Sequence, residues 1–220
     1  MKVILFGIGG VGSWCAETLV RTGVTDLIVV DSDTVEASNL NRQLVALHST
    51  LGRPKVEVMR QRLLDINPDA HITALQKRYD ATTVDEFDFN QYDVVIDAID
   101  SLDDKLLLIQ RATESSARFL SSMGAARRRD PGQVAVAEFW QVKGCPLARA
   151  LRNRIKKEKL FPKKKFLCVY SAEPAFPGSP VVPDTPVVPD IPGSPDIPRL
   201  PSFMTVTATF GIRLASMALQ

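Results

Sequence analysis

The sequence has few cysteines and no long hydrophobic run, and both absences narrow the class of protein. Its 220 residues include only three cysteines, Cys15, Cys145 and Cys168, with no C-x-x-C pair among them. This odd, scattered set disfavours a disulfide framework and a structural zinc site. No apolar stretch reaches the ~20 residues needed to cross a bilayer. We therefore expect a protein of a reducing compartment without a transmembrane segment, located in the cytoplasm, with an organelle association left open.

The sequence also has little net charge and little chain before its first apolar segment. The formal net charge is +2, which is too small to indicate a nucleic-acid ligand by itself. The first strand-like segment starts near Lys2, which leaves no room for a signal or transit peptide. Either the chain starts on its first core strand or a segment upstream is missing.

Strand-like and helix-like segments alternate along the first half of the chain. The predicted strands are "VILFG" (3–7), "DLIVVD" (26–31), "HITAL" (71–75), "YDVVIDAID" (92–100) and "RFLSSMG" (118–124). Predicted helices end near Gly23, run from Pro54 to about Ile66, and run from about Asp103 to Ser115. This order predicts an α/β fold of Rossmann-like, doubly wound type, with a mostly parallel sheet and helices on both faces.

The second half is predicted to extend this domain. It contains strand-like segments at 133–139 and 166–173, a basic helix that starts at Pro146, and a final segment with helical spacing at 205–220. We expect a C-terminal strand/helix extension of the sheet. The predicted division is a domain over 1–173, a proline-rich low-complexity insertion over 174–201, and a helix within 202–220 that packs back on the domain.

The insertion carries a proline at every third position from Pro174 to Pro201. This period matches the three residues per turn of polyproline II and is incompatible with a helix or a central strand. Two interpretations stay open. The segment is either a solvated spacer or a ligand for a proline-recognition domain in a partner.

The first predicted turn carries a phosphate-binding pattern. "GIGGVG" places Gly7, Gly9, Gly10 and Gly12 between a strand and a helix, and Asp31 follows about 20 residues later. Glycines let phosphates approach the backbone, the helix N-terminus favours negative charge, and the acidic residue accepts hydrogen bonds from ribose. The pattern fits both a dinucleotide used for hydride transfer and a nucleotide that is consumed.

The polar residues that follow favour a nucleotide that is split. An enzyme that expels pyrophosphate from ATP must neutralise charge on the phosphates, and it needs a carboxylate for Mg²⁺. Asp97 and Asp100 end a predicted central strand and are expected to face the same crevice. The other candidates in this region are Asp33, Asn39, Arg42, Gln43 and Lys55.

These motifs together resemble a known family. "GIGGVGSW", "DSDTVEASNLNRQ", "GRPKVE", "INP" and "VIDAIDS" are similar to the ubiquitin-activating-type superfamily of ATP-dependent adenylating enzymes. "GGVGSW", "AIDS", the "SAE" after Cys168 and "TVTATFG" resemble its tRNA threonylcarbamoyladenosine dehydratase group. The resemblance covers residues 2 to about 173 and 202–220.

The resemblance implies an ATP-dependent dehydratase that adenylates the carboxylate of threonylcarbamoyladenosine on tRNA and then cyclises it. It assigns the four glycines to the ATP phosphates, Asp31 to the ribose, Arg42 and Lys55 with Asn39 to the triphosphate, and Asp100 to Mg²⁺. Two alternatives stay open. One is an activator of a ubiquitin-like or sulfur-carrier protein, and the other is a catalytically degenerate remnant that acts as a binding module.

The resemblance also bears on a basic stretch and on one cysteine. A tRNA contact is expected from Arg152, Arg154, Lys156, Lys157, Lys163, Lys164 and Lys165, with aromatic residues interleaved. The alternative is a solvated helix face. Cys168 is the cysteine to weigh as a nucleophile, although its apolar neighbours favour a packing role.

Two departures from the family pattern are expected to matter. Relatives carry an N-terminal helical arm that supplies an arginine to the ATP site of the neighbouring subunit, which implies a homodimer. This sequence has no such arm, and its proline repeat replaces a loop and strand that include a further cysteine in relatives. A degenerate site is therefore one of the open alternatives.

Overall fold

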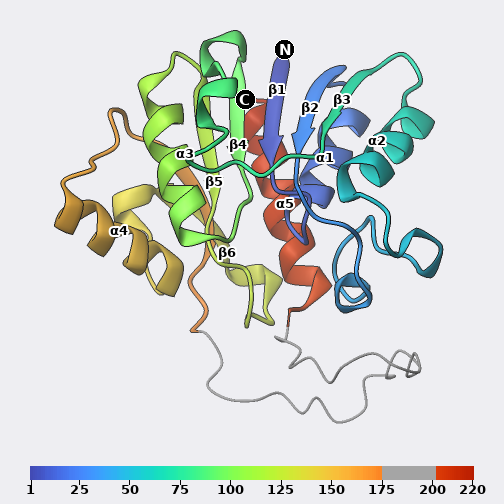
Figure 1. Cartoon of the computed structure of the whole chain (residues 1–220). Helices are drawn as coiled ribbons and strands as arrows, with labels where there is room; N and C mark the ends of the chain where they lie inside the picture. Colours follow the sequence, from blue (N-terminus) through green and yellow to red (C-terminus); the bar gives the residue numbers. More distant parts are fainter. Residues whose placement is uncertain (175–201) are drawn as a thin grey trace.

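The computed structural model describes residues 1–174 and 202–220, and its centre is a seven-stranded sheet (Figure 1). The strands are β1 (Lys2–Phe6), β2 (Asp26–Val30), β3 (His71–Leu75), β4 (Val94–Asp97), β5 (Arg118–Ser122), β6 (Val134–Glu138) and β7 (Leu167–Ser171). The helices are α1 (Gly12–Arg21), α2 (Lys55–Ile66), α3 (Leu102–Glu114), α4 (Pro146–Glu158) and α5 (Met204–Ala218).

The order of the strands across the sheet is β3-β2-β1-β4-β5-β7-β6. All neighbouring strands run parallel except β6, which pairs antiparallel with β7. The predicted α/β doubly wound, mostly parallel sheet is confirmed. The strand order reverses direction between β1 and β4, and in such sheets ligands bind beyond the carboxyl ends of the strands at that point.

Two apolar layers cover the two faces of the sheet. Helices α1, α2 and α5 pack on one face, with Leu19, Met59 and Phe210 in that layer. Helices α3 and α4 cover the other face, together with a short segment that contributes Tyr79, Phe87 and Phe89. Because both faces are covered, the apolar side chains of β1, β2 and β4 are buried on both sides of the sheet.

The C-terminal helix belongs to this core. Phe210 and Leu214 of α5 are fully buried, and the helix lies directly against α1. Gly211 allows this contact, because a Cβ atom there would come within 2.4 Å of the carbonyl oxygen of Val11. The expected packing of the last segment on the domain is thereby observed, and both ends of the chain lie toward the top of the view in Figure 1.

Two predictions concern the segment between β7 and α5, namely the proline repeat and the domain boundaries. Apart from Pro174, the proline repeat lies outside the described residues, and the proposed domain boundaries stay a prediction. Among the described residues, no helix has the length and apolar character of a membrane span.

Candidate functional site

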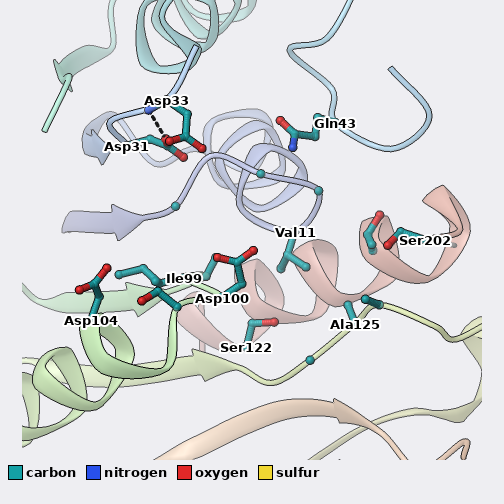
Figure 2. Close-up of a pocket in the computed structure, with 18 of the residues that line it drawn as sticks. Val11, Asp31, Asp33, Gln43, Ile99, Asp100, Asp104, Ser122, Ala125 and Ser202 are labelled. Carbon is teal, nitrogen blue, oxygen red and sulfur yellow. Dashed lines mark hydrogen bonds between the residues drawn. The ribbon is translucent and has the colours of Figure 1, made fainter. Parts of the chain in front are cut away.

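A cleft of about 480 Å³ opens beyond the carboxyl ends of the central strands. Its volume lies in the range of about 300–1,000 Å³ that is typical of small-molecule sites. Figure 2 shows Asp31 and Asp33 on one side of it, Asp100 on the other, and Gln43 and Ser202 at its rim. The predicted residues that line the cleft are Gly7, Gly9, Gly10, Asp31, Asp33, Arg42, Gln43, Lys55 and Asp100.

The glycine turn is shaped by contacts within the protein at two of its positions. Gly7 has a φ of +89°, and a Cβ atom there would lie 2.7 Å from the carbonyl oxygen of Ala98. A Cβ atom on Gly12 would lie 1.7 Å from the carbonyl oxygen of Gly7. Gly12 does not line the cleft. Its lack of a side chain allows α1 to begin directly against the carbonyl oxygen of Gly7.

Gly9 differs from these two, because no described residue fills the space beside it. The nearest atom to a Cβ there would be Nε2 of Gln43, at 3.9 Å. The turn is fixed from behind, where the Ser13 hydroxyl donates to the carbonyl oxygen of Gly9 at 2.7 Å and accepts from the N–H of Leu44 at 3.2 Å. The open space therefore lies on the cleft side, at the N-terminus of α1, where phosphate groups bind in many proteins.

The side chain of Gln43 gives a second indication that a polar ligand binds in the cleft. Its Oε1 atom is buried and has no hydrogen-bond partner among the described residues, although the side chain lines the cleft. Buried polar side-chain atoms are usually paired, so an orphaned one beside a cleft fits a bound polar ligand or water. The turn and this amide together fit the phosphate end of a nucleotide.

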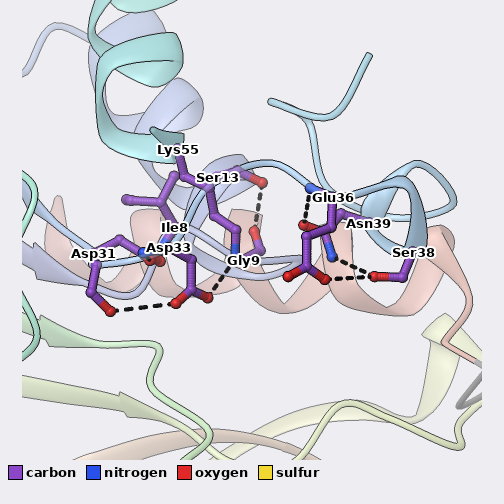
Figure 3. A network of polar contacts seen from close by, with 10 residues as sticks. Ile8, Gly9, Ser13, Asp31, Asp33, Glu36, Ser38, Asn39 and Lys55 are labelled. Carbon is purple, nitrogen blue, oxygen red and sulfur yellow. Dashed lines mark hydrogen bonds and ion pairs between the residues drawn. The ribbon is translucent and has the colours of Figure 1, made fainter. Parts of the chain in front are cut away.

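Asp31 is held in place by two backbone donors (Figure 3). The N–H of Ile8 donates to Oδ2 at 2.6 Å, and the N–H of Asp33 donates to Oδ1 at 2.8 Å. Burial raises the pKa of the Asp31 carboxyl, and the charge of Lys55 and the two hydrogen bonds oppose this shift. Each carboxylate oxygen keeps a lone pair that can accept from a sugar hydroxyl.

Two cations face the same cleft. The Lys55 ammonium is almost fully buried and lies 2.8 Å from Oδ2 of Asp33. The Arg42 guanidinium donates to the carbonyl oxygen of Ser38 and to Oδ1 of Asn41, both at 2.9 Å. Burial lowers the pKa of Arg42, and Asp100 opposes that shift. These partners hold both cations where they can neutralise phosphate charge.

Asn39 is placed differently from the other candidates, because it is buried and does not line the cleft. Its Oδ1 accepts from the N–H of Glu36 at 3.1 Å, and its carbonyl oxygen accepts from the N–H groups of Arg42 and Gln43. Asn39 therefore shapes the turn that presents Arg42 and Gln43. Its direct contact with the triphosphate stays a prediction.

The expectation that Asp97 faces the crevice is wrong. Asp97 is fully buried, and its Oδ2 atom bonds the hydroxyl of Ser121 at 2.6 Å and the ammonium of Lys105 at 2.8 Å. Its Oδ1 accepts from the N–H of Ile99. A buried carboxylate needs such partners, and Lys105 of α3 supplies the matching charge. Asp97 thus fixes the turn that presents Asp100.

The carboxylates of the cleft fit Mg²⁺ only if phosphates of a bound nucleotide supply further ligands. No group of three or more His, Cys, Asp or Glu residues in the described part of the chain is arranged to hold a metal ion. Mg²⁺ in nucleotide sites is usually bound by one or two carboxylates and by substrate phosphates. Asp100 fits that donor set, because it faces the glycine turn across the cleft (Figure 2).

Comparison with known proteins agrees with this geometry. The model of the ThiF family matches residues 1–219. The chain belongs to the ThiF family. It is 39% identical to the tRNA threonylcarbamoyladenosine dehydratase of Bacillus subtilis over 171 residues, which are 78% of this chain and 66% of that protein. The crystal structure of the Escherichia coli enzyme TcdA in complex with ATP superposes with a TM-score of 0.82 at 33% identity, covering 99% of this chain and 84% of that one.

A second kind of relative matches a shorter part of this ThiF-family chain. The sulfur carrier protein ThiS adenylyltransferase of E. coli is 38% identical over 101 residues, which are 46% of this chain and 40% of that protein. The chain thus spans just under two thirds of the length of the B. subtilis dehydratase and less of the other relative.

The cleft of this ThiF-family member includes residues that the sequence motifs did not indicate. Arg78 follows β3 and pairs with Asp104 of α3 at 2.8 Å, and both side chains line the cleft. Ser202, just before α5, and Thr207, in the first turn of α5, also line it. No local pattern could reveal these residues, because they come to the cleft only through the packing of the helices.

The basic stretch divides into two groups. Arg152 donates to the carbonyl oxygen of Phe139 at 3.0 Å, Arg154 pairs with Asp103 at 3.1 Å, and Lys164 donates to the carbonyl oxygen of Ser115 at 2.6 Å. These three have structural partners inside the chain. The exposed members of the stretch are Lys156, Lys157, Lys163 and Lys165.

Cys168 lies in β7 with no exposed surface, and burial raises its pKa well above the ordinary range. A nucleophilic thiol needs access and a thiolate, and Cys168 has neither. The structure therefore favours the packing interpretation of this cysteine.

Proposed function

We propose that this ThiF-family chain binds ATP with Mg²⁺ and adenylates the carboxylate of threonylcarbamoyladenosine on a tRNA. The observation that carries the proposal is the cleft itself, where the open glycine turn, the acceptor Asp31 and the cations Arg42 and Lys55 lie around the same space as Asp100. The similarity of nearly the whole chain to TcdA in complex with ATP supports the same assignment.

In the first step a carboxylate oxygen of the substrate attacks the α phosphorus of ATP, and the bond from that phosphorus to the β phosphate breaks. Arg42 and Lys55 neutralise the charge that develops on the leaving pyrophosphate. The glycine turn positions the phosphates, and Asp31 orients the nucleotide by accepting from ribose. Mg²⁺, when bound, supplies further neutralisation of the phosphates, and Asp100 would hold it.

In the second step a nitrogen or oxygen atom of the ureido group in the same side chain attacks the activated acyl carbon, and that group gives up a proton to water. The bond from that carbon to the adenylate oxygen breaks, AMP leaves, and a cyclic, dehydrated side chain results. Since the attacking atom belongs to the substrate itself, no protein nucleophile is required. The burial of Cys168 is consistent with this route.

The second candidate function is the activation of a ubiquitin-like or sulfur-carrier protein. The match to the ThiS adenylyltransferase favours it, since the first chemical step is the same. The absence of any C-x-x-C pair from the sequence counts against a zinc-containing activator.

Release of pyrophosphate from ATP separates the candidates. It is measured with a tRNA that carries threonylcarbamoyladenosine, with the unmodified tRNA, and with a carrier protein that ends in a flexible glycine tail. We expect release only with the modified tRNA. Release with the carrier alone would support the second function, and no release with any substrate would leave the degenerate binding module.

Arg42→Ala and Lys55→Ala test the site within the same assay. Because each removes a cation from the phosphates, we expect pyrophosphate release to fall by roughly 100- to 1,000-fold. The matched control is Arg53→Ala, which removes an exposed guanidinium outside the cleft that hydrogen-bonds Gln61. Near-normal turnover in either cleft variant would contradict the assignment of the site.

Three further parts of the proposal rest on the sequence and the family resemblance. They are a homodimeric assembly, a proline-recognition domain as a partner of the 174–201 repeat, and a cytoplasmic location. The mass of the purified protein in solution tests the first of them directly.

A further inference from the structure

Two aromatic rings lie exposed side by side near α4, outside the cleft. The Trp140 residue is 38% exposed and Phe161 is 53% exposed. Their ring centroids are 6.2 Å apart, with an angle of 30° between the planes. Since each ring keeps much of its surface in water, the pair offers flat apolar area that the fold itself does not cover.

The fold holds both rings in place. Phe139 is fully buried and meets the Trp140 ring edge-on at 5.3 Å, while the backbone N–H of Trp140 donates to Glu138 at 2.9 Å. On the other side, α4 ends at Glu158, and the left-handed φ of 58° at the next residue, Lys159, turns the chain so that Phe161 returns beside Trp140. A left-handed conformation is uncommon for residues other than glycine, so the chain direction after α4 is set by a distinct backbone turn at Lys159.

Lysine is frequent in the stretch of chain that carries Phe161, and one carboxylate, that of Glu138, contacts the backbone of Trp140. The Lys156 ammonium lies 5.9 Å from the centre of the Trp140 ring, within the distance of a cation–π contact. Lys157, Lys163 and Lys165 are exposed in the same stretch of chain. A ligand for this surface must therefore combine negative charge with flat apolar groups, and single-stranded nucleic acid has both.

The distance from the cleft is compatible with one ligand that touches both places. Leu147, near the start of α4, lines the cleft. Lys156 lies nine residues further along the helix, which is about 14 Å at ~1.5 Å per residue. A nucleic acid that places one nucleotide in the cleft can reach the rings with a nucleotide a few positions away, since α4 lies beside α3 on the outside of the fold (Figure 1).

We infer that Trp140 and Phe161 form a stacking platform for an unpaired base of the RNA substrate, with the nearby lysines holding its phosphates. The choice of RNA rests on the proposed function. The platform would supply affinity without reading the sequence, because every base has a flat face. It would also orient the RNA so that the modified nucleotide enters the cleft.

The first experiment measures the affinity of the full chain for modified tRNA at several salt concentrations, without ATP. We expect Trp140→Ala and Phe161→Ala each to weaken binding by roughly 5- to 100-fold, which corresponds to the loss of one base–aromatic stack. The slope of log affinity against log salt should stay unchanged, because stacking releases no counterions. Lys157→Ala should instead reduce that slope by about one phosphate contact.

Controls separate stacking from misfolding. Trp140→Phe keeps an aromatic face and should restore most of the affinity, while Leu47→Ala removes an equally exposed apolar side chain elsewhere and should change nothing. Trp fluorescence gives a direct readout. If RNA quenches the emission of Trp140, that quenching must be absent in Trp140→Phe. ATP affinity without RNA should be the same in all variants.

The outcomes are distinct from those of the pyrophosphate assay, since binding is read without turnover. The inference is overturned if the alanine variants bind RNA as the parent does, if they change the salt slope, or if RNA leaves Trp140 emission unchanged. Quenching by a synthetic peptide of residues 174–201 but not by RNA would also overturn it, and would assign the rings to the proline repeat.

Discussion

At the scale of single residues, Asp31 is the group whose protonation should be visible in binding. Burial raises the pKa of this carboxyl above its ordinary value near 3.8. As the pH falls, Asp31 is therefore protonated at a higher pH than an exposed aspartate, and the proposed acceptor for ribose then loses its charge. Nucleotide affinity should be full at neutral pH and should decline on the acid side, beginning above the ordinary range of aspartate.

The measurement is the dissociation constant of ATP across acid and neutral pH for the parent and for Asp31→Asn. The variant keeps the shape of the side chain but cannot ionise. We expect it to bind about 10- to 100-fold more weakly at pH 7, as is typical for a lost hydrogen bond to a charged group. Its acid decline should be missing. If Asp31→Asn shows the same acid decline, another group titrates.

A second prediction at this scale concerns Cys168. Its thiol has no exposed surface, and burial raises its pKa. Cys168→Ala should therefore leave pyrophosphate release and cyclisation close to those of the parent, while the small cavity lowers the free energy of unfolding by about 1 kcal/mol. The native thiol should also resist alkylation at pH 8. Loss of the cyclised product with the first step intact would restore Cys168 as a nucleophile.

At the scale of elements, the turn between β1 and α1 combines two glycines that the fold requires with a glycine, Gly9, that has open space beside it and is proposed to admit a phosphate. A Cβ on Gly12 would lie 1.7 Å from the Gly7 carbonyl oxygen, whereas one on Gly9 would have no atom nearer than 3.9 Å. Gly9→Ala should therefore fold normally and lose nucleotide affinity by at least tenfold, because the methyl group occupies the phosphate space. Gly12→Ala should lower the melting temperature, as forced overpacking costs about 1–3 kcal/mol.

Calorimetry and ATP titration of the two variants check this division. Gly132→Ala serves as the control, since a Cβ there would meet only the nearby Asp130 side chain, outside the cleft. If Gly9→Ala binds ATP like the parent, the phosphates lie elsewhere.

The same elements show how far the sequence could predict the site. The strands, the helix after "GIGGVG" and the acidic end of β2 follow from local periodicity and glycine spacing, and they were predicted. Asp97 was misplaced because its direction depends on Lys105 of α3, a partner that no local pattern reveals. Arg78 was missed for a similar reason, since its partner Asp104 belongs to another element.

At the scale of the whole molecule, residues from opposite ends of the chain build one cleft. The turn after β1 supplies Gly9 and Val11, while Ser202 and Thr207 come from the C-terminal segment. Helices α1 and α5 meet where Gly211 leaves room for the backbone of α1. The final helix thus supports α1, which follows directly on the glycine turn. The sequence predicted that this helix packs on the domain, but its partner was visible only in the fold.

Gly211→Ala tests this support. A Cβ there would come within 2.4 Å of the Val11 carbonyl oxygen and 2.8 Å of the backbone nitrogen of Cys15, so α1 and α5 must move apart. We expect the melting temperature to fall by roughly 2–10 °C, from an overpacking cost of about 1–3 kcal/mol. ATP affinity should fall as well, because Val11 lines the cleft. Ile212→Ala, at an exposed position of the same helix, should change neither quantity. A stable Gly211→Ala variant with unchanged ATP affinity would show that the position of the glycine turn does not depend on the packing of the C-terminal helix.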